Sequence, residues 1–128
     1  MSDLQVAKAR LSQGFSFCIV RDGKVIFDSM SSGIRDIYHV VTEHDIRGSS
    51  IADKIIGKAV ALLIVQAGVK SAFAMNINQS ALDLLMSKGV EVEYDHIMDR
   101  LDSMCQFEKA VKDISDPMDA VSALRKFS

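Results

Sequence analysis

The sequence contains no tryptophan, one proline and two cysteines, and it has no excess of basic residues. Cys18 and Cys105 have no paired spacing, which excludes a disulfide framework and a Cys-x-x-Cys metal motif, so we expect a reducing, cytoplasmic setting. A net charge of −2 excludes the strong basic field of nucleic-acid-binding proteins, and no nucleic-acid partner is expected. The glycines form no phosphate-binding loop, and the serines form no Gly-x-Ser-x-Gly motif.

Apolar runs long enough for a membrane are also missing. The run from Ala59 to Val65 is far shorter than the roughly 20 residues that span a bilayer. The N-terminal residues mix charges with apolar side chains, unlike a signal peptide. We therefore expect no membrane association.

Periodicity and turn signals predict one domain over residues 1–128, with a core at about 3–112 and a C-terminal helical extension at about 115–128. The first half of the chain is expected to form a helix at 4–11, a hairpin at 15–27 turning at Asp22-Gly23, a helix at 34–43 and a central helix at 51–67. The second half is expected to form a strand at 69–75, a helix at 80–88 and a strand at 90–94. A helical pattern follows beyond Asp95, and Pro117 opens a last helix. The hairpin must be antiparallel, and the strand–helix–strand unit requires a parallel pair with a right-handed crossover. The predicted fold class is α/β: a three-layer α/β/α sandwich with a mixed sheet, on which the all-apolar central helix packs.

Polar residues gather where the central helix is predicted to begin. Ser50 and Asp53 have the spacing of a capping box, in which each side chain bonds a backbone N–H group. Lys54 and Lys58 would lie one turn apart and oppose the helix dipole unless an anion compensates them. Two interpretations stay open: a solvated, structural motif, or a binding site for an anionic ligand that Ser49 and Ser50 also contact.

A second polar pair lies downstream. Cys105 and Glu108 are three residues apart and share a face if the segment is helical. A thiol at a helix start can act as a nucleophile, with Glu108 as the acid–base group, although an unpaired cysteine is usually inert and redox sensing is a third reading. His39, His44 and His96 stand in no metal-binding motif.

The run from Gly48 to Leu63, with its Ala-Asp-Lys-x-x-Gly-Lys-Ala block, and the segment Cys105–Lys109 resemble a prokaryotic domain-of-unknown-function family with a cytidine-deaminase-like fold. The likeness spans about residues 3–112. The later motif of that family reads Cys-Pro-Met-Glu, and here Gln106 and Phe107 stand at its two middle positions.

The resemblance implies a deaminase scaffold. The zinc ligands that deaminases need can therefore be compared with the residues that this sequence has at the same places. Zinc deaminases carry a His or Cys ligand and a proton-shuttling Glu at the start of the central helix, and a Pro-Cys-x-x-Cys motif after the next strand. In this chain the first place corresponds to residues 52–54, and the two later ligand places fall on Asn78 and Ala81. Because none of them supplies an imidazole or a thiolate, we expect no zinc and no other cofactor.

Two hypotheses for function follow. In the first, a metal-free site binds an anionic, nucleotide-like small molecule through Lys54 and Lys58, Asp53 orients it, and Cys105 and Glu108 supply any chemistry. Whether the protein is an enzyme stays open in this reading. In the second, the chain is a non-catalytic regulatory or interaction module and its charged motif is structural. The sequence leaves homo-oligomer formation open.

Overall fold

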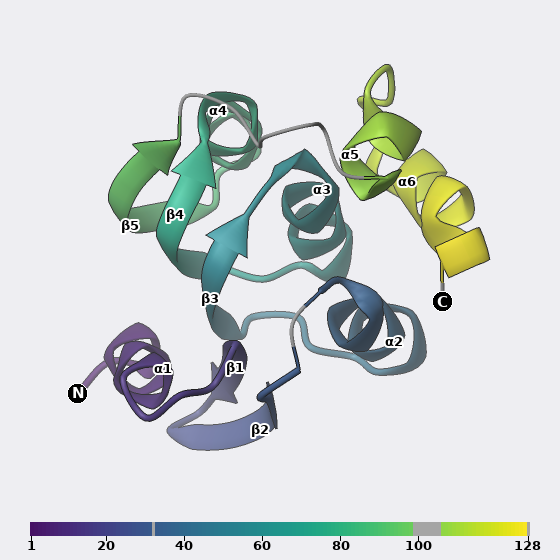
Figure 1. Ribbon diagram of the computed structural model, residues 1–128. Coiled ribbons are helices and arrows are strands. Elements are labelled where there is room, and N and C mark those ends of the chain that lie inside the picture. Colours follow the sequence, from purple (N-terminus) through teal and green to yellow (C-terminus); the bar gives the residue numbers. More distant parts are fainter. Residues whose placement is uncertain (32, 99–105, 128) are drawn as a thin grey trace.

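The computed structural model describes residues 1–31, 33–98 and 106–127, which form a five-stranded sheet with helices on both faces (Figure 1). The strands are β1 (Phe17–Arg21), β2 (Lys24–Ser29), β3 (Ser50–Ile56), β4 (Ser71–Asn78) and β5 (Glu91–Met98). The helices are α1 (Asp3–Leu11), α2 (Arg35–Glu43), α3 (Lys58–Ala67), α4 (Gln79–Ser87), α5 (Gln106–Val111) and α6 (Pro117–Leu124), followed by the 3-10 turn η1 (Arg125–Phe127). The strand order β2-β1-β3-β4-β5 places β3 at the centre of the sheet.

The sheet is mixed, as the sequence predicts. β1 runs antiparallel to β2 and β3, whereas β3, β4 and β5 are parallel to one another. The hairpin turns at Asp22 and Gly23, whose φ angles of 54° and 78° suit a tight two-residue turn. The Asp3 carboxylate of α1 holds this turn, because it accepts hydrogen bonds from the N–H groups of Asp22 (3.1 Å) and Gly23 (2.9 Å).

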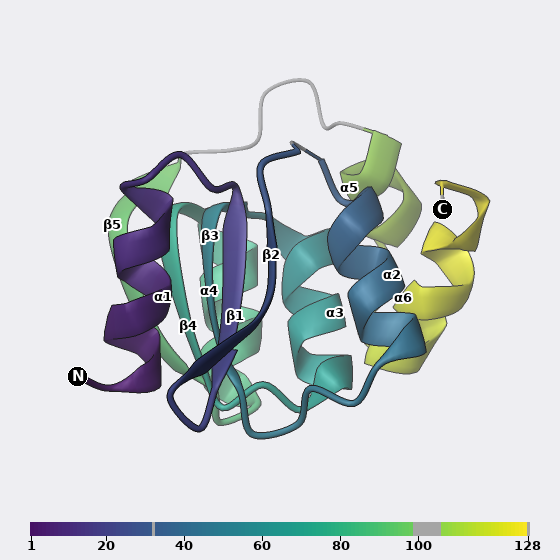
Figure 2. The ribbon, with the colours of Figure 1, turned by 90° about the horizontal axis from the view of Figure 1, so that it is seen from below.

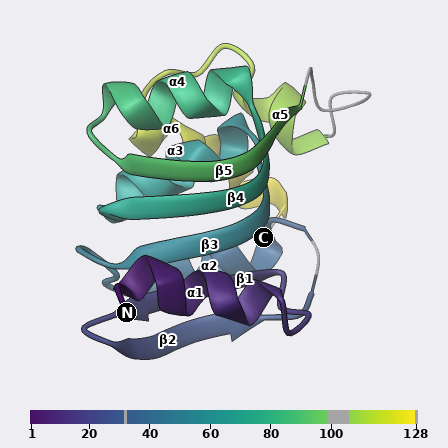
Figure 3. The same cartoon turned by 90° about the vertical axis from the view of Figure 1, so that its left-hand side faces the viewer.

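The helices cover the two faces of the sheet unequally (Figures 2 and 3). Among the described elements, α1 is the one helix on its face, where it lies across β1 and β3, and the opposite face carries α3 and α4 with α2, α5 and α6 around them. The predicted three-layer α/β/α sandwich is therefore confirmed. No helix in the described part of the chain has both the length and the apolar character needed to cross a bilayer.

The central position of α3 is also confirmed. Its Leu62, Leu63 and Ile64 are fully buried, since the sheet lies on one side of the helix and α2 and α6 lie on the other. Ala120 and Leu124 of α6 are buried in the same core as α3. The C-terminal helices therefore pack as part of the domain.

The start of α3 corrects the sequence-based prediction. The sequence predicts a helix from Ile51, but β3 occupies this segment and α3 begins only at Lys58. Ile51 pairs with Ile19 of β1 and with Ala72 of β4, and all three side chains are buried. A central strand that is buried on both faces shows no regular alternation, so its pattern merges with that of the following helix. Gly57 is consequently the N-cap residue of α3 and adopts an extended conformation.

α1 closes a smaller core on its own side of the sheet. Leu4, Ala7 and Leu11 pack in one cluster with Cys18 and Phe73. Burial raises the pKa of the Cys18 thiol to about 11, so this cysteine stays protonated and unreactive at neutral pH. Cys18 is fully buried and packs as a small hydrophobic residue.

β5 forms one edge of the sheet and pairs with β4. It continues to Met98, so the helical pattern predicted beyond Asp95 is wrong for the first residues of that segment. Three acidic side chains, Glu91, Glu93 and Asp95, alternate along the strand and are exposed. The Glu93 carboxylate accepts a hydrogen bond from the Lys8 ammonium of α1 at 3.0 Å.

Gly68 ends α3 in the left-handed conformation (φ 74°, ψ 27°). A Cβ atom on Gly68 would lie 2.8 Å from Cγ of Arg47, so the Arg47 side chain would have to move. We expect Gly68→Ala to lower the free energy of unfolding by about 1–3 kcal/mol through backbone strain and this clash. Gly89→Ala is the matched control, because Gly89 has a φ of 79° but no atom within 4 Å of the added Cβ. Urea denaturation should show the larger loss for Gly68→Ala, and equal losses would rule out a contribution from Arg47.

Candidate functional site

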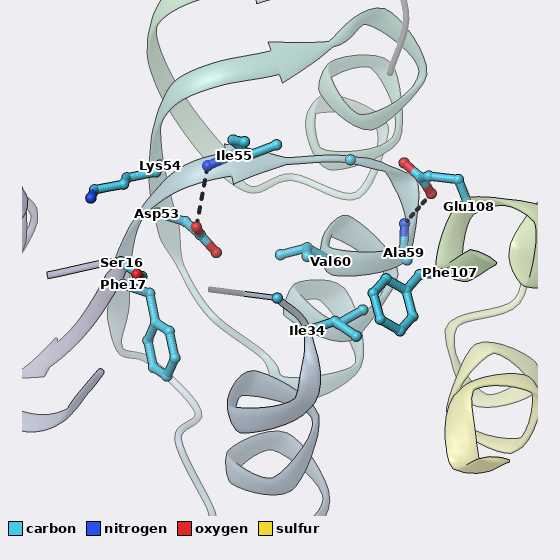
Figure 4. Close-up of a pocket in the computed structure, with 12 residues that line it drawn as sticks. Ser16, Phe17, Ile34, Asp53, Lys54, Ile55, Ala59, Val60, Phe107 and Glu108 are labelled. Carbon is cyan, nitrogen blue, oxygen red and sulfur yellow. Dashed lines mark hydrogen bonds between the residues drawn. The ribbon is translucent and has the colours of Figure 1, made fainter. Parts of the chain in front are cut away.

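A cavity of about 310 Å³ lies at the carboxyl end of β3, where the strand leads into α3 (Figure 4). Segments far apart in the sequence form its walls: the start of β1, the start of α2, the β3–α3 junction and α5. Its lining residues are Ser16, Phe17, Gly33, Ile34, Asp53, Lys54, Ile55, Gly57, Ala59, Val60, Phe107 and Glu108. Crevices beyond the carboxyl ends of the strands are the usual ligand sites of open α/β sheets.

Asp53 is the polar group that points into this cavity (Figure 4). Its side chain is half-buried, and its Oδ1 accepts a hydrogen bond from the Ile55 N–H at 3.2 Å. Burial raises the pKa of the Asp53 carboxyl to about 7, and hydrogen bonds from the backbone N–H groups of Ile55 and Lys54 oppose this shift only in part. Near neutral pH this carboxyl can therefore either donate or accept a proton.

Lys54 contributes to the wall of the cavity, but its ammonium points away from Asp53 and from the cavity (Figure 4). Successive side chains of a strand point to opposite faces of the sheet, and Lys54 follows Asp53 directly in β3. Its side chain is exposed, and its N–H donates to the Ser16 carbonyl oxygen at 3.1 Å. The expected stripe of Lys54 and Lys58 on one helix is wrong, because Lys54 belongs to a strand.

Glu108 of α5 occupies the amino end of α3. Its Oε1 accepts a hydrogen bond from the Lys58 N–H at 2.7 Å, and its Oε2 accepts one from the Ala59 N–H at 3.0 Å. The Asn78 amide, at the start of α4, also donates to Oε1 at 3.4 Å. The Glu108 side chain is buried, so its carboxylate satisfies N–H groups at the positive end of the helix dipole away from water. The sequence predicts Glu108 as an acid–base group; in the structure two of its three hydrogen bonds cap α3, and the third joins it to the Asn78 side chain.

Lys58 lies beside this cap as the first residue of α3. Its ammonium donates a hydrogen bond to the Lys112 carbonyl oxygen at 3.0 Å, just beyond the end of α5. It is not among the residues that line the cavity. Two bonds from Lys58, one from its backbone and one from its side chain, thus hold α5 against α3.

Ser49 and Ser50 lie at the opposite end of β3 from the cavity. The predicted capping box is wrong, because Ser50 begins a strand and its Oγ lies 2.6 Å from Oγ of Ser71 on β4. Ser49 is fully buried, and its Oγ has no hydrogen-bond partner among the described residues. Neither serine lines the cavity, so the structure does not bring them together with Asp53.

Cys105, the predicted nucleophile, lies outside the described residues. The structure does bring Asp53, Lys54 and Glu108 to one cavity, although they come from segments that are more than 50 residues apart. Sequence reasoning missed the apolar walls formed by Phe17, Ile34, Val60 and Phe107. Each reads as an ordinary core residue in its own segment, and only the tertiary arrangement shows that they share a cavity.

The residues at the starts of α3 and α4 do not fit the zinc site of a deaminase. Because α3 begins at Lys58, the first ligand place moves from residues 52–54 to residues 57–59, which are Gly, Lys and Ala. Asn78 caps α4, with its Oδ1 accepting from the Ala81 N–H at 2.9 Å. None of these side chains is an imidazole, a thiolate or a carboxylate. Within residues 1–31, 33–98 and 106–127, no group of three or more His, Cys, Asp or Glu residues could hold a metal ion.

Comparisons with solved structures agree with this architecture. A DUF1893 family protein (TM1506) from Thermotoga maritima superposes with a TM-score of 0.88 at 25% identity, covering 100% of this chain and 92% of the other. The dCMP deaminase of cyanophage S-TIM5 gives a TM-score of 0.50 at 17% identity, covering 74% of this chain and 93% of the other. The T. maritima diaminohydroxyphosphoribosylaminopyrimidine deaminase/5-amino-6-(5-phosphoribosylamino)uracil reductase also gives 0.50 at 17% identity, covering 71% of this chain and 34% of the other. At these identities the two deaminases establish similarity of fold and nothing about activity.

Sequence comparison gives the family directly. No curated protein matches the chain. The model of the family described as TM1506, domain of unknown function (DUF1893), matches residues 6–128 and so includes α5 and α6. The chain has a cytidine-deaminase-like fold in which, among the residues that the structure describes, the zinc-ligand places of deaminases hold no zinc ligand, and it belongs to the DUF1893 family.

Proposed function

We propose that the cavity at the carboxyl end of β3 binds a small planar heterocycle of the nucleobase type, which presents N–H groups or ring nitrogens to Asp53. The observation that carries this proposal is a half-buried carboxyl aimed into a cavity whose other walls are mostly apolar. Ligand sites commonly combine apolar walls with a few polar groups that fix the orientation of the ligand. Phe17 and Phe107 supply aromatic rings to these walls, and aromatic rings pack well on flat, unsaturated molecules.

The charges around the cavity favour a base over a phosphate. Of the described lining residues, Asp53 and Glu108 carry carboxyl groups, and the ammonium of Lys54 points away. The amino end of α3, which would otherwise attract an anion, already holds the carboxylate of Glu108. This proposal makes the sequence-based expectation of an anionic ligand more specific. If the ligand is a nucleotide, its base enters the cavity and its phosphate stays outside.

Protonation of Asp53 suits such a ligand. A carboxyl with a pKa of about 7 is divided between its neutral and ionised forms at neutral pH. The neutral form donates one hydrogen bond and accepts another, as an amino-substituted ring with an adjacent ring nitrogen requires. The deaminase fold supports this choice of ligand, since one of the similar structures is a dCMP deaminase.

The proposal is tested by calorimetric titration with cytosine, 2′-deoxycytidine, dCMP and inorganic phosphate. We expect the three cytosine compounds to bind and phosphate alone to give no signal. Asp53→Ala should weaken cytosine binding by about tenfold or more, because the lost hydrogen bonds to an ionisable group are worth about 1.5–3 kcal/mol. Lys54→Ala is the matched control, since the adjacent side chain points away from the cavity, and it should change the affinity by less than about twofold.

Two outcomes would contradict the proposal. Binding of phosphate that is lost in Lys54→Ala would restore the anionic ligand expected from the sequence. No binding by any of the four compounds would favour the second hypothesis, a non-catalytic interaction module. One observation supports that alternative: the polar groups of Ser50, Asn78 and Glu108 are used in hydrogen bonds within the protein.

A further inference from the structure

We infer that Glu108 is a positioning residue that couples the C-terminal helices to the cavity: its contact with the amino end of α3 holds α5 in place and thereby sets Phe107 as a wall of the cavity. The effect on ligand binding rests on the proposed function. The effect on the position of α5 does not, and it can be measured without a ligand.

The position of α5 depends on the apolar packing of Val111 and Ala110 in the core and on polar contacts with α3. The helix has six residues, and a helix this short is not stable without tertiary contacts. Polar contacts fix it to α3 at two points: the Glu108 carboxylate on the N–H groups of Lys58 and Ala59, and the Lys112 carbonyl oxygen on the Lys58 ammonium. Glu108 is 7% exposed, so its bonds are shielded from water and from salt.

Phe107 connects this contact to the cavity and to the C-terminus. It directly precedes Glu108, and its ring lies close to Ile34 and Ala59 at the rim of the cavity (Figure 4). It also makes an edge-to-face contact with Phe127 of η1, with ring centroids 5.1 Å apart and an interplanar angle of 84°. Loss of the Glu108 contact should therefore move both rings as well as expose the N–H groups of α3.

Binding of a ligand in the cavity and packing of α5 against α3 are then linked. A ligand that contacts Phe107 binds the docked state better, so it must stabilise that state by the same factor by which docking raises its affinity. An occupied cavity would therefore be detectable at α5 and η1, on the outer side of the domain.

The experiment uses Glu108→Ala in the full chain and follows two sites by NMR. We expect amide hydrogen exchange at Lys58 and Ala59 to be at least about tenfold faster than in the wild type, and the ring signals of Phe107 and Phe127 to shift. Excess formate, a small carboxylate that can take the place of the missing side chain, should reverse both changes in Glu108→Ala and leave the wild type unaffected. If Glu108 only caps α3, Glu108→Ala should speed amide exchange at Lys58 and Ala59 but leave the ring signals of Phe127 unchanged. That result would overturn the inference.

Two further measurements complete the test. If Glu108→Ala does not fold, Glu108→Gln, which keeps the shape and one acceptor, should show the same changes to a smaller extent. Cytosine should bind Glu108→Ala at least about tenfold more weakly than the wild type, with recovery in formate. Unchanged cytosine affinity in the variant would overturn the coupling. Absence of cytosine binding to the wild type would overturn the proposed function, while the ring signals and formate recovery still decide the positioning role.

Discussion

Asp53→Asn is expected to raise the free energy of unfolding by about 2–4 kcal/mol near pH 8 and to change it little near pH 4. Folding raises the pKa of Asp53 from 3.8 to about 7, so between these values the folded protein binds more protons than the unfolded chain. Stability contributed by this group is therefore present at low pH and is lost as the pH rises from about 4 to about 7. A pKa change of one corresponds to about 1.4 kcal/mol of free energy, and solvent near the half-buried side chain screens part of the penalty, which gives the expected value of about 2–4 kcal/mol. Asparagine cannot ionise, and its side-chain oxygen can still accept the Ile55 N–H bond.

Urea denaturation of the wild type and Asp53→Asn at several pH values measures this difference. The control is Asp95→Asn, which removes one carboxyl from the exposed face of β5. The control should follow the wild-type profile, whereas Asp53→Asn should lose the decline in stability with rising pH. Parallel profiles for the wild type and Asp53→Asn would show that burial does not penalise the ionised form of Asp53.

Glu108→Ala is expected to lower the free energy of unfolding by about 2–4 kcal/mol, since it leaves buried N–H groups of Lys58 and Ala59 without a partner. At the start of α3, Ala59 is buried and Lys58 is half-buried, so little water can reach these N–H groups to replace the carboxylate. Glu43→Ala is the matched control: its carboxylate lies 3.3 Å from Nδ1 of His39, in an exposed i,i+4 pair, and the expected loss is below about 0.5 kcal/mol. Similar losses in the two variants would contradict the buried-cap explanation.

The fold could be predicted from local signals because most of them agree with the tertiary structure. The Asp22-Gly23 turn, the apolar helix that includes Leu62–Ile64 and the parallel unit formed by β4, α4 and β5 are all present in the structure. The error at β3 has a physical cause. The first three residues of β3, Ser50, Ile51 and Ala52, are buried whichever face of the sheet they point to, so their pattern has no period of two that separates this strand from a buried helix.

The site could be predicted less well, because its parts come together only in three dimensions. The sequence pattern assigns Asp53 to a capping box, but its place in the cavity follows from its being the inward-facing neighbour of Lys54 near the end of β3. Glu108 lies at the start of α3, and its partners there are the backbone N–H groups of Lys58 and Ala59. Every residue except proline has a backbone N–H group, so the residue types do not reveal this pairing, and no sequence motif could have indicated it.

The acidic alternation along β5 limits how copies of the chain can associate. Suppose that the β5 strands of two copies pair in antiparallel fashion with Tyr94 opposite Tyr94. Glu93 of each copy then lies opposite Asp95 of the other. If the strands instead pair with Asp95 at the centre, Asp95 of one copy lies opposite Asp95 of the other. Like charges at directly opposed positions destabilise a strand pair, and charged residues on an edge strand are a common protection against aggregation. Growth of the sheet into a continuous intermolecular ribbon is therefore disfavoured on this side by electrostatic repulsion.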